Sequence, residues 1–156
     1  MKKILKIIAV LLVAAFVAAQ FFRPNRVNPP IVEADTLEAS IPVPDEVSAI
    51  ISRSCADCHS STTRYPWYSN ISPVSWFLAD HIEDGRRELN FSEWNTYSPR
   101  KKGRKLEEIC EQAQAGNMPL PSYLWIHWSA SLSADNIKTL CDWTAMERAK
   151  IGPDVK

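Results

Sequence analysis

The first hydrophobic block of the chain fills most of residues 1–22 and would be apolar on every side of a helix. Three lysines, Lys2, Lys3 and Lys6, precede an almost unbroken apolar run. A basic start followed by an apolar run is typical of a signal peptide or a membrane anchor. We therefore expect residues 1–22 to form a signal-anchor or transmembrane segment, with cleavage after the small residues 17–19 as the alternative.

Such a segment would also fix the location of the protein. The positive-inside rule keeps the lysines in the cytoplasm, so the rest of the chain would lie beyond the inner membrane. We expect a single-pass inner-membrane protein with its folded domain in the periplasm. If the segment is cleaved, the alternative is a soluble periplasmic protein.

Residues 23–43 are rich in proline and have no sustained hydrophobic period, which predicts a stiff, extended linker. From residue 44 to about residue 150, apolar positions recur at helical spacing, and no stretch alternates as a strand would. Four helices are predicted in this domain, and the fold class is therefore all-α. The first helix follows Pro44 and the second follows Ser72-Pro73. The third covers about residues 100–115 and stops at Gly116, and the fourth begins at Ser133.

Charge adds little to this picture. Eighteen basic and eighteen acidic residues give a formal net charge of +0, which argues against nucleic acid as a partner. The one basic cluster, residues 98–105, is interpreted as a solvated helix start, with a docking patch for an acidic redox partner as the alternative.

Candidate chemistry is concentrated in Cys55-Ala56-Asp57-Cys58-His59, a C-x-x-C-H sequence of the kind that attaches c-type haem. On a helical turn, positions i, i+3 and i+4 share one face. Two thiols can then bond the haem vinyl groups while the imidazole reaches the iron below the same ring. Cys55 and Cys58 are thus predicted to hold one haem c covalently, and His59 is the predicted proximal iron ligand.

Other uses of a C-x-x-C pair fit less well. A zinc site usually needs a second close pair of ligands, and Cys110 and Cys141 lie far apart in the sequence. A thioredoxin-like dithiol needs a strand followed by a helix, and no strand is predicted. Cys110 and Cys141 both lie on apolar helix faces, where either a disulfide or two buried thiols is expected.

The second axial ligand is less defined by the sequence. Met118 lies in the proline-rich stretch 117–121 between two predicted helices, where a loop can direct a thioether at iron. A methionine opposite a histidine raises the reduction potential. We predict Met118 as the distal ligand, with His127 and His81 as alternatives and an open site as a further one.

The chain resembles the bacterial haem-binding domain family with a C-x-x-C-H motif. The resemblance covers about residues 44–146. It rests on the stretch CADCHSSTTRYPWYSNISPVSWFLADHIEDGRRELNFSEW, on AGNMPLPSYLWIHWSASLS, and on the dipeptide Asp142-Trp143. It implies a small cytochrome c-like helical domain, membrane-associated, with haem at Cys55, Cys58 and His59.

Three functions compete for such a domain. We expect a one-electron carrier that exchanges electrons with redox partner proteins and receives its haem from the cytochrome c maturation machinery. A haem-based sensor or small-ligand binder is the alternative. A haem peroxidase is less favoured, because the sequence offers only His81 or His127 as a distal acid or base, so we do not expect an enzyme.

Overall fold

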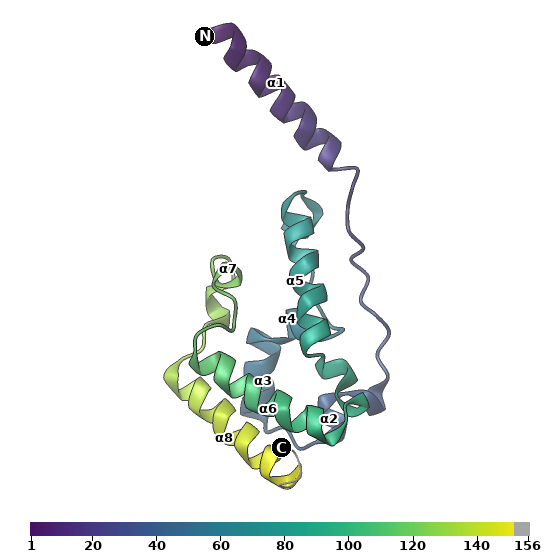
Figure 1. Ribbon diagram of the computed structural model, residues 1–156, viewed down its shortest axis with the longest axis vertical. Coiled ribbons are helices and arrows are strands. Elements are labelled where there is room, and N and C mark those ends of the chain that lie inside the picture. Colours follow the sequence, from purple (N-terminus) through teal and green to yellow (C-terminus); the bar gives the residue numbers. More distant parts are fainter. Residues whose placement is uncertain (152–156) are drawn as a thin grey trace.

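The computed structural model describes residues 1–151, and every regular element in that range is a helix, so the predicted all-α class is confirmed (Figure 1). In chain order the α-helices are α1 (Lys2–Ala19), α2 (Leu37–Ser40), α3 (Asp45–Ser54), α4 (Ala56–His59), α5 (Val74–Glu88), α6 (Pro99–Gln114), α7 (Pro121–Leu124) and α8 (Ala134–Ile151). Four 3-10 helices lie between them: η1 (Glu33–Asp35), η2 (Trp67–Asn70), η3 (Phe91–Thr96) and η4 (Trp128–Ala130).

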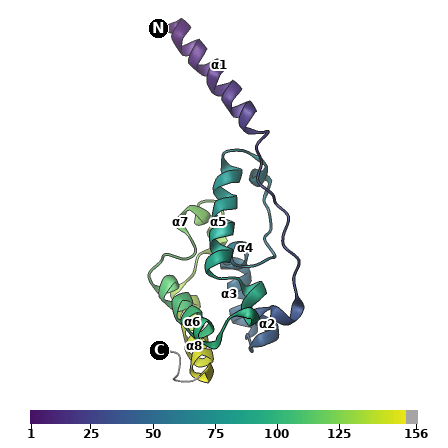
Figure 2. The same cartoon turned by 45° about the vertical axis from the view of Figure 1, so that its right-hand side comes forward.

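Helix α1 projects away from the other helices in both views of the ribbon (Figures 1 and 2). It has 18 residues and begins with the three lysines of the sequence. No helix within residues 1–151 combines the length and the apolar character needed to cross a membrane. The stretch that follows Lys6 in α1 is shorter than the ~20 apolar residues that a bilayer core requires. The predicted signal-anchor or transmembrane segment, and with it the single-pass inner-membrane location, is therefore wrong.

The proline-rich stretch after α1 runs down one side of the helical body toward α2 (Figure 2), and hydrogen bonds join it to that body. Asn28 donates from Nδ2 to the carbonyl of Thr63 at 3.0 Å and accepts at Oδ1 from Arg86 at 2.8 Å. Leu37, in α2, has no exposed surface and belongs to the main hydrophobic cluster. Part of the segment expected to be a linker thus contributes directly to the core.

Helices α6 and α8 lie side by side and carry one wall of the core, which includes Leu106 and Leu140. Ser98 caps α6 by accepting from the N–H of Lys101, and Pro99 fills its first turn. The predicted stop is confirmed at Gly116, whose φ of +69° lies in the left-handed region that favours glycine.

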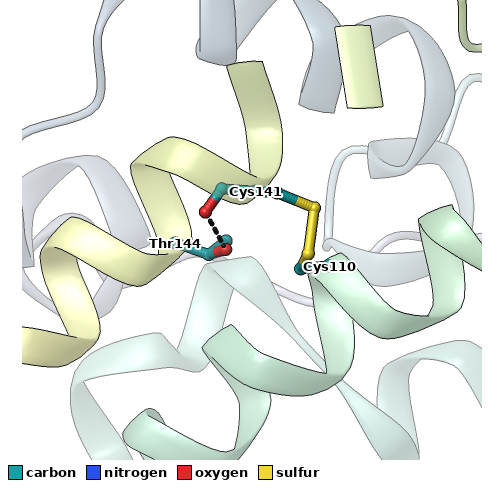
Figure 3. The surroundings of a disulfide bond; sticks show 3 residues. All are labelled: Cys110, Cys141 and Thr144. Carbon is teal, nitrogen blue, oxygen red and sulfur yellow. Dashed lines mark hydrogen bonds between the residues drawn. A yellow bond between two sulfur atoms is a disulfide. The ribbon is translucent and has the colours of Figure 1, made fainter. Parts of the chain in front are cut away.

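A disulfide between Cys110 and Cys141 joins the same two helices (Figure 3). The hydroxyl of Thr144 donates to the carbonyl of Cys141 at 3.0 Å, one turn further along α8. Of the two states that the sequence left open for these cysteines, the structure thus has the disulfide. The bond links two positions that are 31 residues apart in the sequence.

Candidate haem site

The C-x-x-C-H stretch forms the single turn of α4, directly after α3. The N–H groups of Cys58 and His59 donate to the carbonyl of Cys55 at 3.1 and 3.0 Å, which closes the turn. Both cysteines are free thiols, and Cys55, Cys58 and His59 line one cavity together. The structure thus brings together the three residues that the motif predicts.

Two adjoining cavities lie over α4, with volumes of about 370 and 290 Å³. Cofactor sites typically measure roughly 300–1,000 Å³, so the joined space is large enough for a prosthetic group. Most of the first cavity is apolar and lies between α3, α6 and α8, whereas the second opens toward α5 and α7. Six residues line both: Ser54, Cys55, His59, Glu88, Met118 and Pro119.

His59 has a fixed orientation. Its Nδ1 lies 2.9 Å from the carbonyl oxygen of Gly85 and 3.0 Å from that of Leu89. Because carbonyl oxygens only accept, Nδ1 carries the proton and Nε2 keeps its lone pair. Burial lowers the pKa of His59 below its ordinary value, although the two carbonyl hydrogen bonds oppose this shift. The result is a neutral imidazole with one free nitrogen, as metal ligation requires.

The two thiols are held in their protonated form. Burial raises the pKa of Cys55 to about 12, and the neighbouring Cys58 adds to the effect. Burial likewise raises the pKa of Cys58 to about 11, with Asp57 as the second cause. Because the thiolate is the reactive species in oxidation and exchange, these cysteines are protected from both at neutral pH.

Helix α5 packs on α4 so closely that one position needs glycine. A Cβ added at Gly85 would lie 2.7 Å from the carbonyl oxygen of Cys58, and backbone cannot move aside as a flexible side chain can. This close approach also brings the carbonyl of Gly85 within reach of His59. Gly85 therefore couples the position of α5 to the orientation of the imidazole.

We expect Gly85→Ala to lower the free energy of unfolding by about 1–3 kcal/mol, as overpacking in a tight contact does. Chemical denaturation of the purified protein measures this change. Glu83→Ala, at an exposed position of the same helix, is the control and should stay within about 0.5 kcal/mol of the parent protein. Equal stability of Gly85→Ala and the parent would contradict the close packing of α4 on α5.

Met118 lines both cavities together with residues of α4. It lies in the loop between α6 and α7, and the N–H groups of Asn117 and Met118 both donate to the carbonyl of Gln112, at 3.0 and 3.2 Å. These bonds fasten the start of the loop to the end of α6. Met118 and His59 therefore line the same two cavities.

The two alternative histidines differ in their relation to this space. His81 lines the second cavity, with Nδ1 2.7 Å from the carbonyl of Phe77. His127 lines neither of the two large cavities. Its Nε2 lies 3.1 Å from the hydroxyl of Tyr68, and its ring stacks on Tyr123 with 4.1 Å between centroids. His127 therefore has a packing role in the wall behind α7.

A charged cluster at the cavity was missed by the sequence reasoning. Lys105, within the stretch interpreted as a solvated helix start, is only 5% exposed and lines the first cavity. Its Nζ lies 2.5 Å from Glu108 and 3.6 Å from Glu88, and both of these carboxylates line the same cavity. The one feature of the sequence that could have indicated the burial of Lys105 is its position next to the apolar residue Leu106.

One buried polar atom in the cavity has no partner of its own. Ser54 is 7% exposed and lines both cavities, and its hydroxyl makes no hydrogen bond within the described part of the chain. Buried hydroxyls are nearly always hydrogen-bonded, so an orphan here indicates that the cavity holds a polar or partly polar group. Together with the apolar lining, the free thiols and the neutral imidazole, this fits a haem.

The sequence from residue 14 to residue 146 matches the haem-binding domain family. The chain belongs to this family. The match includes the whole of the cavity walls and begins within α1, further toward the N-terminus than the resemblance noted from the motifs. The predicted haem cofactor is therefore confirmed as haem binding, while covalent attachment to Cys55 and Cys58 stays a prediction.

Comparison with curated proteins and with solved structures found no significant match.

Proposed function

We propose that this haem-binding domain is a one-electron carrier. Cys55 and Cys58 would hold a haem c through thioether bonds, with His59 and Met118 as its axial ligands. The observation that carries this proposal is that His59, with Nδ1 bonded to backbone carbonyls and Nε2 left free, lines the same cavity as two free thiols and Met118. When bound, the haem would supply a reversible ferric/ferrous couple.

A ferric/ferrous couple needs ligands that change little between the two states and surroundings that exclude water, and the residues around the cavity could provide both. His59 and Met118 would offer the iron a neutral imidazole and a thioether in both oxidation states, which would keep the geometric change between the oxidised and reduced forms small. Apolar walls from α3, α6 and α8 exclude water and favour the less charged reduced state. Met118, as a soft neutral ligand, would raise the reduction potential further.

Attachment would join each thiol to a vinyl group, with the sulfur forming the new bond to carbon and the thiol proton passing to the other vinyl carbon. This addition needs neither oxidant nor reductant. Because burial raises the pKa of both thiols, the reaction should not proceed rapidly by itself in the folded domain. We therefore propose the cytochrome c maturation machinery as one partner, and redox proteins as the partners of the finished carrier.

The ligand assignment is tested by Met118→Ala. We expect the oxidised parent protein to show the weak long-wavelength absorption band of a thioether–iron bond, and the reduced parent to resist carbon monoxide. The variant should lose the band and bind the gas readily, and its reduction potential should fall, because a vacant or water-filled position replaces a methionine. Absorption spectroscopy and potentiometric titration measure all three.

His81→Ala is the matched control, since His81 also lines the second cavity. It should leave the band and the gas resistance unchanged. A parent protein that lacks the band and binds carbon monoxide at once, with Met118→Ala identical to it, would contradict the carrier and favour a haem-based sensor or ligand binder.

A further inference from the structure

Asp57, one of the two residues between the cysteines, accepts four hydrogen bonds through its side chain. Its side chain is 15% exposed. Oδ1 accepts from Arg64 Nε and from the Arg64 backbone N–H, both at 3.1 Å, and Oδ2 accepts from Arg64 Nη2 at 3.2 Å. Oδ2 also accepts from the hydroxyl of Tyr123 at 2.8 Å. Arg64 thus fixes the carboxylate, and the carboxylate then binds Tyr123.

Tyr123 belongs to α7, the short helix that follows Met118 through the proline-rich stretch. The backbone forms a hydrogen-bonded turn here, because the N–H groups of Tyr123 and Leu124 donate to the carbonyl of Leu120 at 2.9 and 3.2 Å. Burial, with the hydrogen bond to Asp57 as the second cause, raises the pKa of Tyr123 above its ordinary value. Its hydroxyl is therefore protonated and is the donor of the bond.

The loop that carries Met118 is consequently held at two points. Its start is bonded to the carbonyl of Gln112 at the end of α6, and its end is bonded to Asp57 in α4. Met118 and Tyr123 both line the second cavity together with Cys58 and His59. The second attachment thus ties the distal side of the haem cavity to the turn that carries the proximal histidine.

We propose that Asp57 and Tyr123 are positioning residues that hold Met118 at the distal face of the haem, with Arg64 orienting the carboxylate. This inference rests on the proposed function, because it assumes that Met118 is a ligand. The hydrogen bond sets how often the loop moves away, and so how readily a competing ligand enters. The exposed Arg64–Asp57 ion pair contributes little by itself, since Arg64 is 67% exposed and screened by solvent.

Tyr123→Phe tests the inference with the smallest change, because it removes the hydroxyl and keeps the ring that stacks on His127. Loss of a hydrogen bond to a charged group should raise the fraction of detached loop by about tenfold or more. We expect carbon monoxide to bind the reduced variant about tenfold faster than the parent. The thioether band should also be weaker, while the amount of covalently attached haem stays the same.

Variants of Asp57 distinguish a role in positioning Met118 from a role in stabilising the fold alone. Asp57→Ala should give the same gas-binding rate as Tyr123→Phe, and the double variant should not raise this rate further, because both changes remove the bond between Tyr123 and Asp57. Asp57→Asn keeps an acceptor for Tyr123 and should partly restore the parent rate. Asp142→Asn is the control, because it removes a different ion pair, with Lys138 on α8. This variant should keep the thioether band of the parent protein.

A Tyr123→Phe protein that melts at a lower temperature but keeps the parent band and gas-binding rate would overturn the inference, because the bond would then be structural alone. This result differs from failure of the proposed function. In that case the parent itself lacks the band, and Met118→Ala has the same spectrum as the parent.

Discussion

His59→Ala is expected to lose the haem spectrum of the parent protein and to lower the yield of haem-loaded protein, because the proximal ligand of the iron is removed. Removing an outer partner of a metal ligand typically costs roughly 10–100-fold in metal affinity, and loss of the ligand itself should cost more. Neither of the other two histidines lies on the turn that carries the two cysteines, because His81 belongs to α5 and His127 precedes η4. The measurement is the haem content per polypeptide, with absorption spectra of whatever haem remains.

The chain offers matched controls, since it has three histidines in all. His81→Ala should keep the haem content of the parent. Adding free imidazole to His59→Ala should restore part of the parent spectrum, because a small ligand can enter the space left by the side chain. A His59→Ala protein with parental haem content and an unchanged spectrum would exclude His59 as the proximal ligand.

Replacing Cys55 and Cys58 together with alanine should abolish covalent attachment. Each thioether is a separate bond, so Cys55→Ala and Cys58→Ala alone should each keep a haem that stays with the denatured chain. In the double variant, acid and organic solvent should extract all of the haem from the polypeptide. Extraction followed by spectroscopy of both phases measures the difference.

The remaining pair of cysteines provides the control. Cys110→Ser with Cys141→Ser removes the disulfide between α6 and α8, and this should lower the free energy of unfolding by roughly 3–4 kcal/mol for the 31-residue separation. The haem should nevertheless remain covalently attached. If haem resists extraction from the Cys55→Ala/Cys58→Ala protein, the thioether assignment is wrong.

Much of the local structure could be predicted from the sequence. The bounds of α6 and α8 agree closely with the apolar periodicity, because both helices bury one continuous face. The grouping of Cys55, Cys58 and His59 followed from spacing within one turn. Gly116 ended its helix as expected, since only its own backbone conformation was involved.

Contacts between distant segments were not predictable in the same way. Nothing near Gly85 in the sequence indicates that its backbone meets Cys58, and nothing near Tyr123 indicates a bond to Asp57. Lys105 was assigned to solvent because charged residues surround it, yet tertiary packing buries it beside Glu88 and Glu108. The expected membrane segment was wrong because the apolar run that follows Lys6 in α1 is shorter than a bilayer core requires.

The most direct test of the account is the mass of the denatured parent protein produced in a host that assembles c-type cytochromes. Because Cys55 and Cys58 are free and line the cavity with His59, the account predicts the polypeptide plus one haem, still coloured after acid and solvent extraction. A polypeptide mass without haem, from protein that loses its colour on extraction or has none, would contradict it.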